Sequence, residues 1–150
     1  MSRPSKRARS VLHYCQDTEA SVLRILIADD SAMVRRGVIT LLSSETTWEI
    51  CGEASDGSEA LLKARTLLPD VILLDVSMPG LNGLEVARRL RQESPNTRIV
   101  VMSQHDPVHL LPGVMAAGGD ACLDKSRLAA DLVNSIRKLQ PRDEHSPASK

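Results

Sequence analysis

Residues 70–83 read DVILLDVSMPGLNG, and this stretch decides how the rest of the chain is interpreted. Val71–Leu74 are four consecutive apolar residues, a run that is typical of a strand buried on both faces of a parallel sheet. The run ends on a carboxylate, Asp75, and the turn-forming pairs Pro79-Gly80 and Asn82-Gly83 follow it. Ligands of open α/β sheets bind beyond the carboxyl ends of the strands. The sequence therefore predicts that Asp75 lies in a functional site.

The composition narrows the class of protein. The 150 residues are enough for one domain with a hydrophobic core, and 19 basic residues balance 19 acidic ones. No net charge therefore points to nucleic acid or to membranes, and one Trp, one Tyr and no Phe offer few platforms for stacked bases. Cys15, Cys51 and Cys122 form no Cys-x-x-Cys pair, which argues against a disulfide framework or a zinc site. With no membrane-spanning run and no signal peptide, we expect a cytoplasmic protein.

The chain is expected to divide into three parts. Residues 1–21 carry four basic residues and no hydrophobic period, which indicates a flexible basic tail. Residues 22–140 contain the periodic segments and are predicted to form one folded domain. Residues 141–150 follow a proline and are predicted to form a polar tail.

Five strands alternating with five helices are predicted within residues 22–140. The strands are expected at 23–28, 48–53, 71–74, 98–102 and 121–123. The helices are expected at 31–42, after a cap at Asp56, from Asn82 to before Pro95, after Asp106-Pro107, and from a Ser126 cap to before Pro141. This alternation implies a parallel sheet with helices on both faces, and five units fit the flavodoxin-like doubly wound (βα)5 order 2-1-3-4-5. Because an interior proline costs about 3 kcal/mol, Pro112-Gly113 predicts a fourth helix that is short, kinked or partly unwound.

Polar residues follow directly on four of the predicted strands: Asp29-Asp30, Asp75, Ser103 and Lys125. Each has an ordinary explanation, as a helix cap or a loop residue. Their joint position at one edge of a parallel sheet instead favours a single site. Three carboxylates at close range repel one another unless a cation joins them, and Mg²⁺ suits carboxylates together with a phosphate oxygen. A lysine and a hydroxyl also suit a phosphoryl group, and carboxylates can act as nucleophiles that form aspartyl phosphates.

Together these motifs resemble a known family. The segments LRILIADDSAMVRRGVITLL, WEICGEASDGSEAL, PDVILLDVSMPGLNGLEVARRLR, TRIVVMSQHD and DACLDKS are similar to the receiver domain of two-component response regulators. The resemblance covers residues 22–140 and is strongest to the subfamily usually joined to a LuxR-type helix-turn-helix. Too few residues follow Lys125 for such a DNA-binding domain, so we expect no direct nucleic-acid binding by this chain.

The resemblance implies a metal site. Asp30 and Asp75 would ligate Mg²⁺ directly, together with the backbone carbonyl of Ser77. Asp29 would act directly or through a water molecule.

The resemblance also implies a reaction and its partners. Asp75 would be the phosphoacceptor and would take a phosphoryl group from a phosphohistidine on a sensor histidine kinase. Ser103 would hydrogen-bond a phosphoryl oxygen, and Lys125 would pair with it. The modified protein would then change its affinity for a downstream protein that the sequence does not identify, and phosphorylation-driven homodimerisation is a further expectation. Such a domain is a signalling protein that promotes its own phosphorylation and dephosphorylation, not an enzyme acting on other substrates.

Two positions depart from the family pattern. Cys122 stands where the family usually has Tyr or Phe, and Pro112-Gly113 interrupts the fourth helix. They leave open a degenerate receiver that works as a protein-interaction module without phosphorylation. A phosphatase or phosphotransferase resembling the haloacid dehalogenases is a more distant alternative, because Ser77 stands where those enzymes carry a second Asp.

Overall fold

The computed structural model describes residues 21–140. The predicted basic tail, apart from residue 21, and the predicted polar tail at 141–150 lie outside the described residues. No helix within residues 21–140 combines the length and the apolar character needed to cross a membrane.

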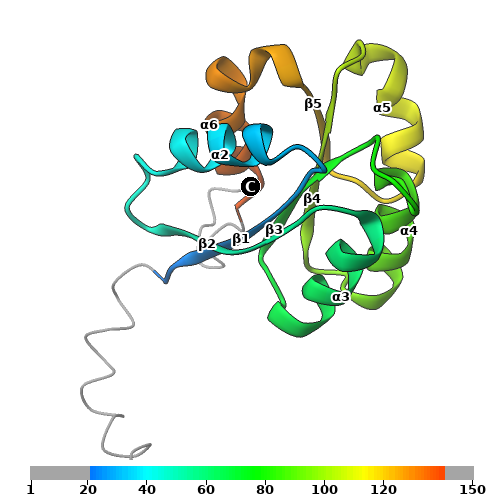
Figure 1. The fold of residues 1–150 in the computed structure, drawn as a ribbon, viewed down its shortest axis with the longest axis horizontal. Coiled ribbons are helices and arrows are strands. Elements are labelled where there is room, and N and C mark those ends of the chain that lie inside the picture. Colours follow the sequence, from blue (N-terminus) through cyan, green and yellow to red (C-terminus); the bar gives the residue numbers. More distant parts are fainter. Residues whose placement is uncertain (1–20, 141–150) are drawn as a thin grey trace, which may run out of the picture.

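Strands and helices alternate along the chain as predicted (Figure 1). The elements are β1 (Leu23–Ala28), α2 (Ala32–Leu42), β2 (Trp48–Ala54), α3 (Gly57–Leu67), β3 (Val71–Asp75), α4 (Gly83–Glu93), β4 (Arg98–Ser103), α5 (Pro107–Ala116), β5 (Ala121–Asp124), the 3-10 turn η1 (Lys125–Arg127) and α6 (Leu128–Leu139). All strand pairs are parallel, and the sheet order is β2-β1-β3-β4-β5. The predicted doubly wound (βα)5 fold is therefore confirmed.

The sheet separates two hydrophobic cores because successive side chains of a strand point to opposite faces. Ile25 and Ile27 belong to the core under α2 and α6, whereas Leu26 belongs to the core under α3, α4 and α5. Figure 1 shows the same division, with α2 and α6 together on one side of the sheet. The central strand β3 is buried at all five residues, but β2 is only partly buried, as expected for an edge strand.

Most of the helices begin directly after a side-chain cap, and the cap fixes the residue at which the preceding loop ends. Ser31, Asp56, Asn82 and Asp106 each accept a hydrogen bond from a backbone N–H in the first turn of the following helix. The predicted cap at Ser126 is wrong. The carboxylate of Asp124 accepts from both the backbone N–H and the hydroxyl of Ser126, so a 3-10 turn forms first and α6 begins only at Leu128.

Helix α5 runs without interruption through Pro112. The predicted partial unwinding is therefore wrong, although α5, with 10 residues, is the shortest α-helix of the described part. Pro112 lacks the N–H that would bond to the carbonyl of Val108. The helix accommodates the loss of this one hydrogen bond and continues to Ala116.

Candidate functional site

The carboxyl ends of β1, β3 and β5 surround a cavity of about 320 Å³. The sheet register places these ends side by side, since Ala28 pairs with Leu74 and Ser103 pairs with Asp124. The residues that line the cavity are Asp29, Asp30, Ser31, Val34, Asp75, Ser77, Gln104, His105 and Lys125. The structure thus brings together five of the six predicted site residues.

Three carboxylates meet in this cavity. One oxygen from each of Asp29, Asp30 and Asp75 lies within 4.8 Å of the other two, and this is the one such cluster of possible metal ligands within residues 21–140. Asp29 is fully buried and Asp75 is 3% exposed, whereas Asp30 is exposed. Asp29 Oδ1 accepts a hydrogen bond of 2.9 Å from the backbone N–H of Ser31, which fixes its side chain.

Lys125 is the counter-charge of the cluster. Its Nζ lies 2.7 Å from Asp29 Oδ2 and 3.2 Å from Asp75 Oδ1, and its side chain is only 12% exposed. The contact with Asp29 is a close ion pair, and it satisfies the charge of a carboxylate that is fully buried.

Burial and charge shift the ionisation of the cluster. Burial raises the pKa of Asp75 and the nearby Asp29 raises it further, while the N–H of Ser77 and the ammonium of Lys125 offset only part of this effect. Burial lowers the pKa of Lys125, but its contacts with the two carboxylates outweigh that effect and the pKa is raised overall. Lys125 therefore stays charged at neutral pH, and Asp75 has a carboxylate whose ionised form is disfavoured.

Two predicted serines occupy different positions. The backbone N–H of Ser77 donates to Asp75 Oδ1 at 3.1 Å, and Ser77 lines the cavity. Ser103 is fully buried at the end of β4 and does not line the cavity; its hydroxyl accepts a hydrogen bond of 2.9 Å from the backbone N–H of His105. Its hydroxyl proton remains available for a further hydrogen bond.

The sequence did not single out the lining residues Gln104 and His105. His105 is exposed and lines the cavity. Its position three residues after the end of the predicted strand 98–102 is the signal that could have identified it.

The donor set fits a hard divalent cation. The side chains of the cluster offer only carboxylate oxygens as ligands, which Mg²⁺ prefers. Three ionised carboxylates and one ammonium also leave a net charge of −2.

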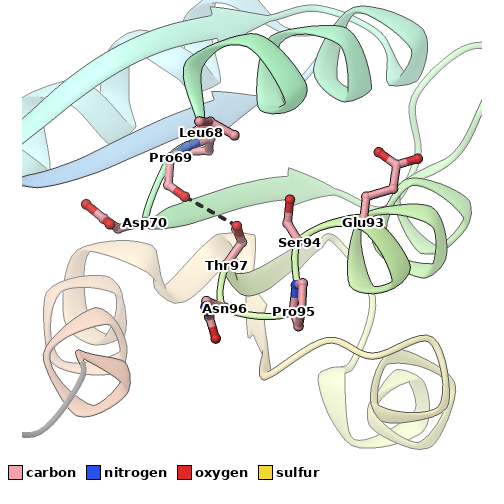
Figure 2. Close-up of a pocket in the computed structure, with 8 residues that line it drawn as sticks. All are labelled: Leu68, Pro69, Asp70, Glu93, Ser94, Pro95, Asn96 and Thr97. Atoms are coloured by element: carbon pink, nitrogen blue, oxygen red, sulfur yellow. Dashed lines mark hydrogen bonds between the residues drawn. The ribbon is translucent and has the colours of Figure 1, made fainter.

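A second cavity, of about 360 Å³, lies at the opposite ends of the strands (Figure 2). It is formed by residues 68–70 and 93–97, and the hydroxyl of Thr97 donates to the carbonyl of Pro69 across it. Its two carboxylates already have partners: Asp70 accepts from the backbone N–H of Arg24, and Glu93 pairs with an arginine of α3. Neither carboxylate of this cavity is therefore without a partner.

Comparison with known proteins agrees with the geometry of the site. The family profile described as the response regulator receiver domain matches residues 25–137. The chain is 36% identical to the transcriptional regulatory protein LiaR of Bacillus subtilis, covering 86% of this chain and 63% of LiaR. It is 34% identical to the response regulator GacA of Pseudomonas viridiflava, covering 77% of this chain and 54% of GacA. The chain thus spans less than two thirds of the length of these relatives.

Solved structures show the same likeness. The signal receiver domain of NarL from Mycobacterium tuberculosis superposes with a TM-score of 0.76 at 31% identity, covering 82% of this chain and all of that one. A LuxR-family two-component response regulator from Aurantimonas gives a TM-score of 0.75 at 30% identity, covering 79% of this chain and 85% of that one. This chain belongs to the response regulator receiver domain family of two-component signalling.

Proposed function

We propose that Asp75 accepts a phosphoryl group from a phosphohistidine of a sensor histidine kinase. The observation that carries this proposal is the convergence of Asp29, Asp30 and Lys125 on Asp75 at one sheet edge. An oxygen of Asp75 would form the new bond to phosphorus while the bond from phosphorus to the histidine nitrogen breaks. The contacts found for Asp75 within residues 21–140 go to Oδ1, from Ser77 and Lys125, so Oδ2 is the better candidate for the attacking oxygen.

The carboxylates of Asp29, Asp30 and Asp75 and the backbone carbonyl of Ser77 are proposed to hold Mg²⁺. When bound, the ion would neutralise the carboxylates and the charge on the transferred phosphoryl oxygens. The close approach of the three carboxylates supports this assignment, because one oxygen from each lies within 4.8 Å of the other two.

Lys125 and Ser103 are proposed to bind the phosphoryl group. Lys125 already lies 3.2 Å from the acceptor carboxylate and carries its charge at neutral pH. Ser103 retains a free hydroxyl proton but lies just outside the cavity lining. We propose that the end of β4 moves on phosphorylation so that this hydroxyl bonds a phosphoryl oxygen, and that the movement carries the signal to the surface.

We place this activity in cytoplasmic signalling, where phosphorylation would change binding to a partner protein or to a second copy of the chain. The domain would promote its own phosphorylation and dephosphorylation. The helices and strands of residues 21–140 all belong to the receiver fold, so we propose no direct DNA contact for them.

The test is phosphorylation of the full chain by a small acyl phosphate, with and without Mg²⁺, followed by mass spectrometry. We expect one added phosphoryl group that depends on Mg²⁺ and is lost in Asp75→Asn. Asp106→Asn is the matched control, because asparagine caps a helix as well as aspartate does and Asp106 does not line the cavity. Phosphorylation that persists in Asp75→Asn would refute the assignment. A wild type that is never phosphorylated would favour the phosphorylation-independent interaction module.

A further inference from the structure

We infer that Arg35 is a positioning residue for the acidic cluster, through the peptide bond that joins Asp29 to Asp30. The inference rests on the proposed metal site. Arg35 lies in the first turns of α2, outside the residues that line the cavity. Its guanidinium nevertheless reaches the backbone of the metal-binding pair.

The guanidinium of Arg35 connects three elements. Nη1 donates a hydrogen bond of 2.6 Å to the backbone carbonyl of Asp29, just beyond the end of β1. Nε donates at 2.8 Å to Glu53 Oε1 on β2. The Arg35 side chain is only 18% exposed, and its bond to the Asp29 carbonyl is partly buried, whereas its bond to Glu53 is exposed to water. An arginine suits this position because its planar fork holds two acceptors in a fixed relative orientation.

The bonded carbonyl belongs to the Asp29–Asp30 peptide. The N–H of Asp29 donates to the carbonyl of Ala54 at 3.0 Å, so the other side of Asp29 is held by β2. Arg35 and Ala54 together fix the backbone orientation from which both carboxylates project.

The two carboxylates depend on that backbone to different degrees. The Asp29 side chain has contacts of its own, with the N–H of Ser31 and the ammonium of Lys125. The Asp30 carboxylate makes no hydrogen bond or ion pair to any residue that the structure describes, and Asp30 is exposed. The position of Asp30 in the cluster is therefore set by its backbone, and Arg35 holds the peptide that precedes it.

The test is calorimetric titration of the full chain with Mg²⁺. Calorimetry is preferable to intrinsic fluorescence, because Trp48 stands at the start of β2 and the site lies beyond its far end. Removing a group that orients metal ligands typically weakens metal binding by about 10–100-fold, and we expect Arg35→Gln to fall in this range. Arg36→Gln is the control, since Arg36 is the exposed neighbour on the same helix, and it should bind Mg²⁺ like the wild type.

A double-mutant cycle separates positioning from a general loss of structure. If Arg35 acts through Asp30, Arg35→Gln should weaken Mg²⁺ binding much less in an Asp30→Asn background than in the wild type. Arg35→Lys, which keeps one donor for the Asp29 carbonyl, should recover part of the lost affinity. Full additivity of Arg35→Gln and Asp30→Asn, or wild-type affinity in Arg35→Gln, would overturn the inference. A wild type that binds no Mg²⁺ would instead refute the proposed metal site, and the inference would fall with it.

Discussion

Replacing Gly83 with alanine tests how closely helix α4 packs against the end of β3, which carries Asp75, the proposed phosphoacceptor. Gly83 is the first residue of α4, and a Cβ there would lie 2.4 Å from the backbone oxygen of Asp75 and 2.9 Å from the Cα of Val76. These are backbone atoms, which cannot rotate away as the end of a flexible side chain can. Restoring the first contact to 3.4 Å, an ordinary van der Waals distance, requires a relative movement of about 1 Å.

The expected cost follows from that movement. Overpacking of this kind destabilises a protein by about 1–3 kcal/mol, and each kcal/mol lowers the melting temperature of a domain of this size by about 3–6 °C. The movement also displaces the backbone of Asp75, and a misplacement of about 1 Å at a reacting group can cost up to roughly 100-fold in rate. We therefore expect Gly83→Ala to melt below the wild type and to be phosphorylated about 10–100-fold more slowly by an acyl phosphate.

Gly37→Ala provides the matched comparison in thermal melts. Gly37 lies inside helix α2, and a Cβ there would meet no atom within 4 Å. Alanine is the better helix former, so this variant should gain about 0.5–1 kcal/mol. A Gly83→Ala variant that melts at or above the wild type and is phosphorylated at the same rate would refute the close-packing argument. The melting comparison stands even if the wild type is not phosphorylated at all.

Three further predictions concern charge. Because the pKa of Asp75 is raised by burial and by Asp29, the folded state disfavours its ionised form; without Mg²⁺ we expect Asp75→Asn to melt above the wild type at pH 7. That advantage should shrink as the pH falls through the raised pKa and vanish below the ordinary value of 3.8; an unchanged advantage at low pH would contradict it. Lys125→Met leaves two buried carboxylates without a counter-charge, so urea titration should show a loss of about 1–3 kcal/mol at neutral pH that shrinks in saturating Mg²⁺. Arg91 pairs with Asp120 at 2.9 Å and donates to several loop carbonyls at the edge of the sheet opposite the site. Arg91→Ala should therefore lower the free energy of unfolding by about 1–3 kcal/mol in urea titration and leave the Mg²⁺ affinity measured by calorimetry unchanged. Weakened Mg²⁺ binding would show that stability and site geometry are not separable.

The fold was predictable because its signals are local. The strands other than the edge strand β2 are short, mostly apolar runs that end at or next to a polar residue, as at Asp75 and Ser103. The convergence of the site residues then follows from topology, since parallel strands place their carboxyl ends on one edge. No contact had to be known in advance to expect Asp29 and Lys125 near Asp75.

Features that depend on particular contacts were not predictable in this way. Ser126 and Asp124 are both residue types that can cap a helix. Asp124, the last residue of β5, is the one whose side chain caps the 3-10 turn. The contact of Arg35 with Glu53 joins residues 18 positions apart and leaves no periodic signal in the sequence. The continuity of α5 through Pro112 depends on how the surrounding structure compensates one lost backbone hydrogen bond, which the composition of the segment does not reveal.

The net charge of the site bears on how the proposed phosphorylation of Asp75 would act. With all groups ionised, Asp29, Asp30, Asp75 and Lys125 carry a net charge of −2 in a largely buried setting, while the whole chain has a formal net charge of zero. Without a cation, burial and the nearby Asp29 raise the pKa of Asp75, so the folded protein disfavours its ionised form. A divalent cation would offset the excess negative charge and favour the ionised carboxylate that a nucleophile requires. Phosphorylation would then add negative charge at the same residue, and Lys125, whose Nζ lies 3.2 Å from Asp75 Oδ1, could pair with the added phosphoryl group.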